Sequence, residues 1–445
     1  MPPNELMPSP PESERDCEVL VIGGGPAGST IAALLAQRGR DVVLLEKSRH
    51  PRFHIGESLL PLNLPLFEKL GVKEQIESLA MMKYGVEFNS PHHDHAVTLD
   101  FSQAWDKSLP YAYQVRRSEF DEVLFRNAQI KGAHTQQEVR VTQVEFHDNG
   151  ARVRAKREDG VELGWNTRFV VDASGRDTFF ANQFRIKEKN KRHNSAAVFG
   201  HFSGVHRLEG RAEGNISIFW FDHGWFWLIP LSDGTTSIGA VCWPYYLKTR
   251  KTSVDPFFLD TIALCPALAK RMEHARLVAP ATATGNYSYT ATRASGRHHI
   301  MLGDAYAFID PVFSSGVFLA MHSAFVGADT VETCLDRPRE AEAALGHFDQ
   351  TSRLGPKVFS WFIYRVTTPA MRELFMNPRN DGRLVEGLLA VLAGDIFRGT
   401  PIGGRVFAFK GLYYLTALSY MGRTIAAWRR RKRVARETLD EVVVS

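Results

Sequence analysis

One segment near the N-terminus limits the folds open to this chain. Residues 17–22, Cys-Glu-Val-Leu-Val-Ile, form a short apolar run that leads directly into Gly23-x-Gly25-x-x-Gly28, and a helical pattern follows up to Gly39. A second apolar run ends in Glu46, about twenty residues beyond the glycines. A strand, a glycine-rich turn, a helix and a second strand ending in an acid predict a dinucleotide-binding α/β unit.

Each glycine has its own physical role in such a turn. Gly23 permits the tight turn, Gly25 lets the backbone approach a pyrophosphate, and Gly28 lets the helix pack closely on the strand. The helix N-terminus at Ala27 presents free N–H groups to an anion. We expect Glu46 to accept hydrogen bonds from the ribose hydroxyls of the dinucleotide.

Composition and charge are typical of an enzyme and not of a nucleic-acid binder. Of 445 residues, 44% are hydrophobic and 23% are charged, and the net charge is only +5. The N-terminal residues 1–15 lack an apolar run, so we expect a disordered tail with no signal peptide or membrane span. The four cysteines lack metal-binding spacing, which favours a cytoplasmic protein without a bound metal. They are Cys17, Cys242, Cys265 and Cys334.

Two further segments favour FAD over NAD. They are Val115-x-Arg117-x-x-Phe120-Asp121 at the start of a predicted helix, and strand 299–302 followed by Gly303-Asp304. Together with Val170-Val-Asp172-Ala-Ser-Gly175-Arg176, they resemble the glutathione-reductase-type flavoproteins. This resemblance implies that Asp304 contacts the flavin ribityl chain, and Arg117 could reach the pyrophosphate or adenosine side. Because no second G-x-G-x-x-G occurs, we expect a separate flavin reductase, or a transient nicotinamide visit, to supply the electrons.

The pattern along the chain predicts a composite α/β architecture. We expect an FAD-binding Rossmann-like domain of the glutathione-reductase type, with an inserted antiparallel-sheet substrate region above the flavin and a helical C-terminal part. The clearest strands are 216–221, 225–231 and 236–243, and Asp233-Gly234 between the last two is typical of a hairpin turn. The predicted boundaries are 16–83, 105–178 and 286–345 for the FAD-binding domain, 84–104 and 179–285 for the sheet region, and 346–445 for the helical region.

The last forty residues combine an apolar segment with a basic run. Residues 405–428 are largely apolar, but Lys410 and Arg423 interrupt them, which favours a buried or surface-lying helix over a bilayer span. The run Arg429 to Arg433, with Arg436 beyond it, is typical of a solvated helix end. The functional alternative is a docking site for an acidic carrier protein or for anionic lipid.

Gly224-Trp225-x-Trp227-x-Ile229-Pro230 is the most informative stretch. Residues two apart in a strand share a face, so both indoles and Ile229 are expected on one side. If that side faces the cofactor, the rings fill the space beside the flavin. The chemistry on the substrate then takes place elsewhere, and a small diffusible species leaves the flavin. Two tryptophans taken alone would be ordinary sheet core.

Two complete motifs resemble those of the flavin-dependent halogenases. One is Gly-Trp-x-Trp-x-Ile-Pro at 224–230, and the other is Phe-x-x-Pro-x-x-Ser-x-Gly at 308–316. The resemblance implies that reduced FAD, oxygen and chloride or bromide generate hypohalous acid, which travels past the tryptophans. We expect the halide near Ser315 and Gly316, where N–H groups at a helix start offer an anion site.

Lys83 is the predicted catalytic residue. It follows the Gly56-Glu57-Ser58 segment at the distance that the family's essential lysine has. An ammonium group can hydrogen-bond hypohalous acid or form a haloamine, and burial would lower its pKa. Outside this context, one lysine before a strand would be a solvated surface charge.

The remaining features bear on the substrate and on other functions. Phe313 stands where halogenases of free tryptophan have a glutamate, so a phenolic or pyrrolic substrate is expected, free or tethered to a carrier protein. The alternatives are a monooxygenase or an isoprenoid-type reductase on the same scaffold, or a non-catalytic flavin-binding protein.

His54 is a candidate for the flavin-site wall. We expect residues 91–95, which hold three histidines, to form an exposed polar loop and not a metal site.

The predicted site residues fall into four groups. The cofactor group is Gly23, Gly25, Ala27, Gly28, Glu46, Lys47, Arg117, Asp304, Pro311, Gly316 and Val317. The halide group is Ser315 and Gly316. The tunnel and pocket group is Trp225, Trp227, Phe313 and Glu57, and the catalytic group is Lys83 alone.

Overall fold

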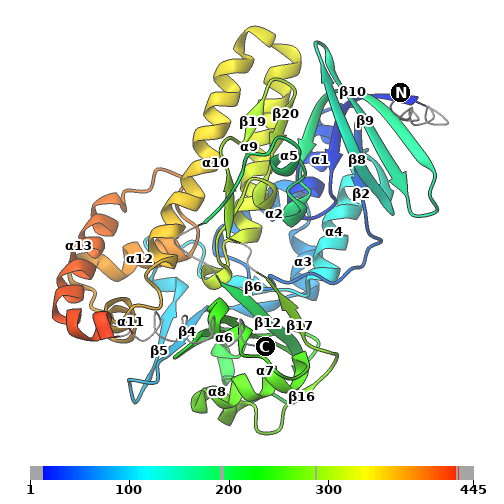
Figure 1. Ribbon diagram of the computed structural model, residues 1–445. Helices are drawn as coiled ribbons and strands as arrows, with labels where there is room; N and C mark the ends of the chain where they lie inside the picture. Colours follow the sequence, from blue (N-terminus) through cyan, green and yellow to red (C-terminus); the bar gives the residue numbers. More distant parts are fainter. Residues whose placement is uncertain (1–13, 191–194, 286–287, 427–428, 430–445) are drawn as a thin grey trace, which may run out of the picture.

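The computed structural model describes residues 14–190, 195–285, 288–426 and 429 (Figure 1). The tail expected over residues 1–15 lies outside this range up to residue 13. Glu14 and Arg15 already belong to the first strand, β1 (Glu14–Ile22). They pair with Gly164 and Trp165 of a neighbouring strand, so the strand begins earlier than the apolar pattern predicts.

A mostly parallel sheet forms the upper part of the molecule in Figure 1. Its strand order is β19-β20-β10-β1-β2-β7, and the contacts from β20 through to β7 are all parallel. All five residues of β2 are buried, as expected of a parallel strand covered on both faces. The bounds are β2 (Val42–Glu46), β7 (His134–Gln137), β10 (Glu162–Asp172), β19 (Ser295–Gly296) and β20 (His299–Met301).

Helices cover this sheet, and an antiparallel ribbon extends it. Helix α1 (Pro26–Gln37) packs against α4 (Arg117–Ile130) and α9 (Gly316–Asp336). The ribbon of β8 (Val139–His147) and β9 (Gly150–Arg157) joins the sheet through β10. This arrangement confirms the predicted FAD-binding Rossmann-like fold.

A second sheet lies below the first and has the order β16-β12-β15-β14-β13-β4-β5. Its contacts are antiparallel except for that between β4 and β13, which is parallel. The predicted hairpin at Asp233-Gly234 joins β14 to β15, and Gly234 adopts the left-handed φ of +86° that the turn requires. The bounds are β4 (Gly85–Asn89), β5 (Ala96–Asp100), β12 (Ala196–Ser203), β13 (Ile216–Phe221), β14 (Gly224–Pro230), β15 (Thr236–Cys242) and β16 (Arg276–Leu277), with β17 (Thr282–Thr284) beside β12.

Part of the region predicted to be strands is helical. Three helices, α6 (Pro244–Lys248), α7 (Val254–Ala263) and α8 (Pro266–Arg271), lie between β15 and β16. Each has a proline within its first helical turn, where a missing N–H costs little. Phe258 and Leu268 pack with Phe202 and Phe226 in a separate apolar cluster on the second sheet. Strand-like alternation therefore misled the prediction over this stretch.

The C-terminal region is mostly helical over its described residues and begins slightly before residue 346. Its longer helices are α10 (Ala341–Ile363), α11 (Pro369–Met376), α12 (Leu384–Leu392) and α13 (Gly403–Ser419). In Figure 1, α11 to α13 gather at the left, and α11 contacts β4 and β5. Within the described residues, no helix combines the length and apolar character needed to cross a lipid bilayer.

The histidine loop at 91–95 is mostly exposed, as predicted, but two of its histidines contact the C-terminal helices. His93 Nε2 lies 3.2 Å from a carboxylate oxygen of Glu373 on α11. His95 Nε2 lies 3.0 Å from the main-chain oxygen of Met376, at the end of the same helix. The loop therefore docks the second sheet onto the C-terminal helices.

Candidate functional site

A cavity of about 790 Å³ lies between the two sheets. Gly23, Gly25 and Glu46 line it from the parallel sheet and its first turn, and Trp225 and Trp227 line it from the second sheet. Ligands of open parallel sheets bind at the carboxyl ends of the strands, which is where this cavity lies. Its volume suits a large organic ligand.

The glycine turn has the geometry that a dinucleotide needs. Gly23 has a φ of +100°, and a Cβ placed there would lie 2.4 Å from the carbonyl oxygen of Ala173. A Cβ at Gly28 would lie 1.8 Å from the carbonyl oxygen of Gly23, so helix and turn touch. At Gly25 the nearest atom would be Arg52 Nη2 at 3.6 Å, and Gly25 lines the cavity. The backbone at Gly25 is thus open to a phosphate, as FAD requires.

Glu46 is fixed at the end of β2. One carboxylate oxygen accepts a hydrogen bond of 2.7 Å from the N–H of Gly24, and the other accepts one of 2.9 Å from the N–H of Ser48. The side chain is buried but still lines the cavity, where it can accept further bonds from a ribose. Lys47 also lines the cavity and forms an ion pair with Asp177.

Arg117 and its partners form a rigid charged part of the wall. Its guanidinium donates to Asp121 at 2.8 and 3.1 Å and to the carbonyl oxygen of Ile55 at 2.9 Å. Burial opposes the charge of Asp121, yet Arg117 and Arg52 together hold the pKa of that carboxyl below its usual value. The guanidinium is therefore held at the cavity edge beside the Gly56 segment.

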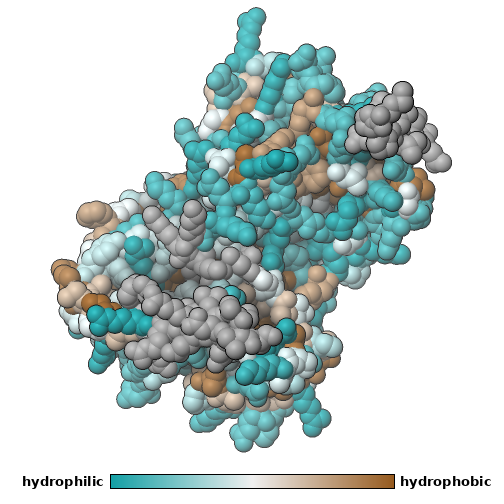
Figure 2. All heavy atoms as spheres, in the orientation of Figure 1, coloured by the Kyte–Doolittle hydropathy of each residue, from teal (hydrophilic) through white to brown (hydrophobic). Residues whose placement is uncertain are grey.

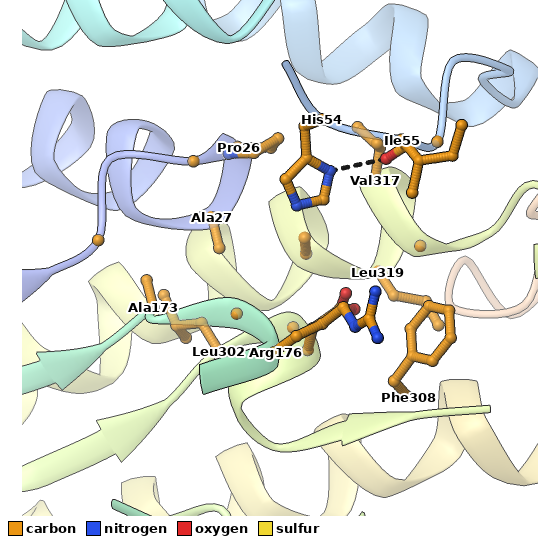
Figure 3. Close-up of a pocket in the computed structure, with 18 of the residues that line it drawn as sticks. Pro26, Ala27, His54, Ile55, Ala173, Arg176, Leu302, Phe308, Val317 and Leu319 are labelled. Carbon is orange, nitrogen blue, oxygen red and sulfur yellow. Dashed lines mark hydrogen bonds between the residues drawn. The ribbon is translucent and has the colours of Figure 1, made fainter. Parts of the chain in front are cut away.

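His54 lines the cavity, as the sequence suggested (Figure 3). Its Nδ1 lies 2.7 Å from the carbonyl oxygen of Ile55 and must donate, because a carbonyl only accepts. Burial, reinforced by the nearby charge of Arg117, lowers the pKa of His54 to about 4. The ring is therefore neutral at neutral pH, with Nε2 as an acceptor.

The opposite wall comes from the Gly303-Asp304 segment and the start of α9. Asp304 follows β20 in the short helix η5 (Gly303–Ala305), and burial raises the pKa of its carboxyl to about 6. Helix α9 begins at Gly316, and its first turn faces the cavity near Leu319 and Phe308 in Figure 3. A helix N-terminus at this wall favours an anion. Pro311, Ser315, Gly316 and Val317 all line the cavity.

Two indoles form the wall contributed by the second sheet. Trp225, Trp227 and Ile229 line the cavity together, as the strand periodicity predicts. The indole centroids of the two tryptophans lie 6.0 Å apart, and Trp227 Nε1 donates to Ser237 Oγ at 3.1 Å. A Cβ at Gly239, on the paired strand β15, would lie 2.1 Å from the Trp227 ring. Gly239 therefore provides the space in which this indole lies.

Lys83 is buried behind the cavity wall. It ends β3 (Met81–Lys83), which pairs with β6 (Ala112–Gln114), and it is 1% exposed. Its Nζ donates to Ser58 Oγ at 2.9 Å and to the carbonyl oxygen of Leu59 at 3.0 Å, and it lies 5.3 Å from the Phe101 ring centroid. Burial lowers the pKa of the amine to about 7. An amine with this pKa is partly neutral at neutral pH and can react as a nucleophile.

Ser58 and Glu57 connect the cavity to this lysine. Both line the cavity, whereas Lys83 does not. One carboxylate oxygen of Glu57 lies 2.7 Å from His201 Nε2 on β12. The other oxygen, Oε2, is buried without a hydrogen-bond partner within the described part of the chain. The segment thus presents a free acceptor on one side and supports the lysine on the other.

The structure separates one predicted pocket residue from the rest. Phe313 does not line this cavity, because its ring packs into the core at 6.2 Å from the Phe362 ring of α10. Gly28 lies behind the turn, as a packing glycine should. Ser58 and His201 were not predicted. Ser58 lies in the segment singled out beside Glu57, but the contact of His201 with Glu57 spans 144 residues and has no local signal.

Comparison with known proteins agrees with this geometry. A family model described as an FAD binding domain matches residues 16–330. The structure of the myxobacterial chondrochloren halogenase CndH, described as a new variant of FAD-dependent halogenases, aligns with a TM-score of 0.75 and 30% identity. The alignment covers 92% of this chain and 97% of that one. This chain belongs to the flavin-dependent halogenase family.

Two curated relatives show how far the likeness extends. Tryptophan 2-halogenase from Chondromyces crocatus is 36% identical over 329 residues, covering 72% of this chain but only 61% of that protein. The 1H-pyrrole-2-carbonyl-[peptidyl-carrier protein] chlorinase of Pseudomonas fluorescens is 28% identical over 412 residues, covering 87% of this chain and 91% of that protein. The FAD binding domain matched over residues 16–330 makes this homologue a flavoprotein.

Proposed function

We propose that this protein chlorinates or brominates an electron-rich aromatic compound, with Lys83 as the catalytic residue. The observation that carries this proposal is the position of Lys83. Its amine is buried and has a pKa of about 7. It donates a hydrogen bond to the hydroxyl of Ser58, a residue that lines the cavity proposed for FAD. A structural lysine would instead be expected at the surface or paired with a carboxylate.

The cavity residues would hold FAD and the halide. The turn at Gly25 would bind the pyrophosphate, Glu46 the ribose and Asp304 the ribityl chain, and the first turn of α9 would hold the halide. Reduced FAD would supply two of the four electrons that oxygen takes up, and chloride or bromide would supply the other two, so that the products are hypohalous acid and water. Arg117 stays fixed at the wall through Asp121, so it can contribute charge without moving.

Trp225 and Trp227 would keep the organic substrate away from the flavin. With both rings against the cavity, only a small oxidant passes toward Ser58. At Lys83, the neutral amine and hypohalous acid give a haloamine and water. Transfer of the halogen to an aromatic carbon then breaks the nitrogen–halogen bond and displaces a proton from that carbon. The nitrogen takes up one proton and becomes the amine again, so atoms and charge balance.

The finer assignments concern the substrate and the partners. The named relatives act on tryptophan and on a pyrrole held by a peptidyl-carrier protein. Phe313 in place of the glutamate of the tryptophan type favours a phenol or a pyrrole, free or carrier-bound. Because the sequence has a single G-x-G-x-x-G, a separate flavin reductase would supply the reduced FAD.

The proposal is tested by measuring the mass of the reaction products. The purified protein with a flavin reductase, oxygen and either chloride or bromide should give products with the isotope pattern of the supplied halide from a panel of phenols and pyrroles. Lys83→Ala should lose these products while flavin oxidation continues, and Lys73→Ala, on the surface of α3 (Lys73–Leu79), should behave as wild type. Hydroxylated products alone, or rapid oxidation of NADPH by the isolated protein, would refute the proposal.

A further inference from the structure

An apolar stripe is exposed along the C-terminal helix α13 and the helical residues 421–426 that follow it. Its large side chains are between 43% and 79% exposed. Four of them lie within α13, where positions 7, 8 and 11 counted from Phe407 share one face of the helix: Phe407, Tyr414, Leu415 and Leu418. The other two, Met421 and Ile425, follow the turn at Tyr420, beyond the end of α13.

The fold does not use this face. Helix α13 packs on α11 and α12 through its other side, where Phe409 and Tyr413 are buried. In Figure 2, brown spheres lie over the α13 end of the molecule, at the left. Contiguous apolar surface of this kind marks a site of interaction with another surface.

The charge along the described part of this segment has one sign. Residues 401–426 contain Arg405, Lys410 and Arg423 and no aspartate or glutamate; in the sequence, six more arginines and lysines follow up to Arg436, and then Glu437, Asp440 and Glu441. The acidic side chains on the helices beneath are already engaged, since Glu373 contacts His93 and Tyr420, and Glu386 pairs with Arg383. The net charge of the whole chain is only +5, so the basic excess is concentrated here.

We propose that α13 docks this protein on an anionic lipid surface. The apolar stripe would lie at the boundary between headgroups and acyl chains, with the arginines and lysines among the phosphates. An apolar face within purely basic surroundings is the pattern of helices that lie in the plane of a membrane. In this position the helix does not cross the bilayer, so the two charges within the segment, Lys410 and Arg423, can stay at the lipid headgroups.

Two other occupants fit the observations less well. A second copy of the chain would bring the basic residues beside two apolar stripes together, and like charges repel across such a contact. An acidic protein would match the charge, but the exposed apolar side chains continue from α13 past the turn at Tyr420 into a second helical segment. Apolar side chains spread over two surface segments suit the extended surface of a membrane better.

The experiment is vesicle flotation with the full-length, FAD-loaded protein. Vesicles of phosphatidylcholine alone are compared with equimolar phosphatidylcholine and phosphatidylglycerol, at low and high salt. Leu415→Glu/Leu418→Glu places two charges in the stripe. Leu259→Glu/Leu264→Glu is the matched control, because these two leucines of the α7 region are similarly exposed on another part of the surface.

Wild type and control should float with the anionic vesicles, less at high salt, and the stripe variant should bind about tenfold more weakly or worse. Flotation measures binding and requires no halogenation, so its result is independent of the proposed function. If the proposed function holds, all three proteins should halogenate a small dissolved phenol equally. Absence of wild-type binding, or equal binding by the stripe variant, would overturn the proposal. It would also be overturned if the stripe variant only dissociated a dimer in sedimentation, or only lost binding to an acidic carrier protein.

Discussion

The amine Nζ of Lys83 lies 2.9 Å from the hydroxyl Oγ of Ser58, and of these two residues only Ser58 lines the cavity. The cavity and the amine are therefore on opposite sides of one side chain. Such a separation suits a reaction in which a small oxidant moves and the organic substrate does not approach the flavin. It also makes Ser58 the residue that fixes where the amine points.

Replacing Ser58 by alanine should reduce halogenation and leave FAD binding intact. Without the hydroxyl, Lys83 keeps only the carbonyl of Leu59 as a hydrogen-bond partner. The loss of a hydrogen bond to a charged or reactive group corresponds to about a tenfold to hundredfold fall in product formation. Product and peroxide are measured in the same reaction, and peroxide should rise as product falls.

Ser58→Thr serves as the conservative variant and should restore most of the activity, since it keeps the hydroxyl. Ser78→Ala removes an exposed hydroxyl on α3 that donates to the Gln75 carbonyl and should have no effect. If Ser58→Ala lost FAD as well as product, the serine would be a cofactor residue and not a positioning residue for Lys83.

Lys83→Met should make the protein inactive but more stable near neutral pH. In the folded protein, burial lowers the pKa of Lys83 from 10.5 to about 7. Between these values the unfolded chain binds a proton that the folded chain does not, so the stability of the wild type rises with pH across this window. Methionine removes the cost of burying the charge and should add roughly 1–3 kcal/mol at pH 7, after the loss of two hydrogen bonds.

The pH dependence distinguishes this cause from simple repacking. Denaturant unfolding at several pH values should show the advantage of Lys83→Met shrinking as the pH rises from 7 toward 10.5. A gain that stayed constant across this range would mean that the lysine pays no electrostatic cost in the fold.

The sequence predicted the cofactor half of the site well, because its signals are local. The strand, the turn at Gly23 and Gly25, and the acid Glu46 are joined by short connections, so their relative positions follow from the fold class. The pair Trp225 and Trp227 was likewise placed correctly, since a strand presents every second residue to one face.

Other features depend on contacts between distant segments and could not be predicted. The support of Lys83 by Ser58 and the pairing of Glu57 with His201 join different elements. Phe313 was expected in the pocket by analogy, but the packing of α10 behind it draws the ring into the core. The helices between β15 and β16 were missed because their short apolar runs are compatible with strands as well.

Gly239→Ala should damage the tryptophan wall without touching FAD. The added methyl would lie 2.1 Å from the indole of Trp227, which must then move. Overpacking of this kind costs about 1–3 kcal/mol, and the displaced ring would no longer seal the cavity beside Trp225. We expect less halogenated product and more peroxide per FAD oxidised.

Ser237→Ala, which removes only the hydrogen bond of the indole, should give a smaller change in the same direction. An unchanged ratio of product to peroxide in both variants would show that the wall does not guide the oxidant.

Two glycine variants should separate contact with the cofactor from the needs of the fold. Apart from its chain neighbours, a Cβ at Gly25 would have Arg52 Nη2 as its nearest protein atom, at 3.6 Å, and the residue lines the cavity, so Gly25→Val should fold normally. Its methyl groups would occupy the space where the backbone meets the pyrophosphate, and FAD affinity should fall by about a hundredfold or more.

At Gly28 the Cβ would lie 1.8 Å from the Gly23 carbonyl oxygen, so Gly28→Ala must displace α1 itself. Thermal unfolding of the FAD-free proteins, compared with flavin fluorescence titration, should show a loss of stability for Gly28→Ala and only a loss of binding for Gly25→Val. If Gly25→Val bound FAD as tightly as wild type, the pyrophosphate would have to lie elsewhere, and the assignment of this turn would be wrong.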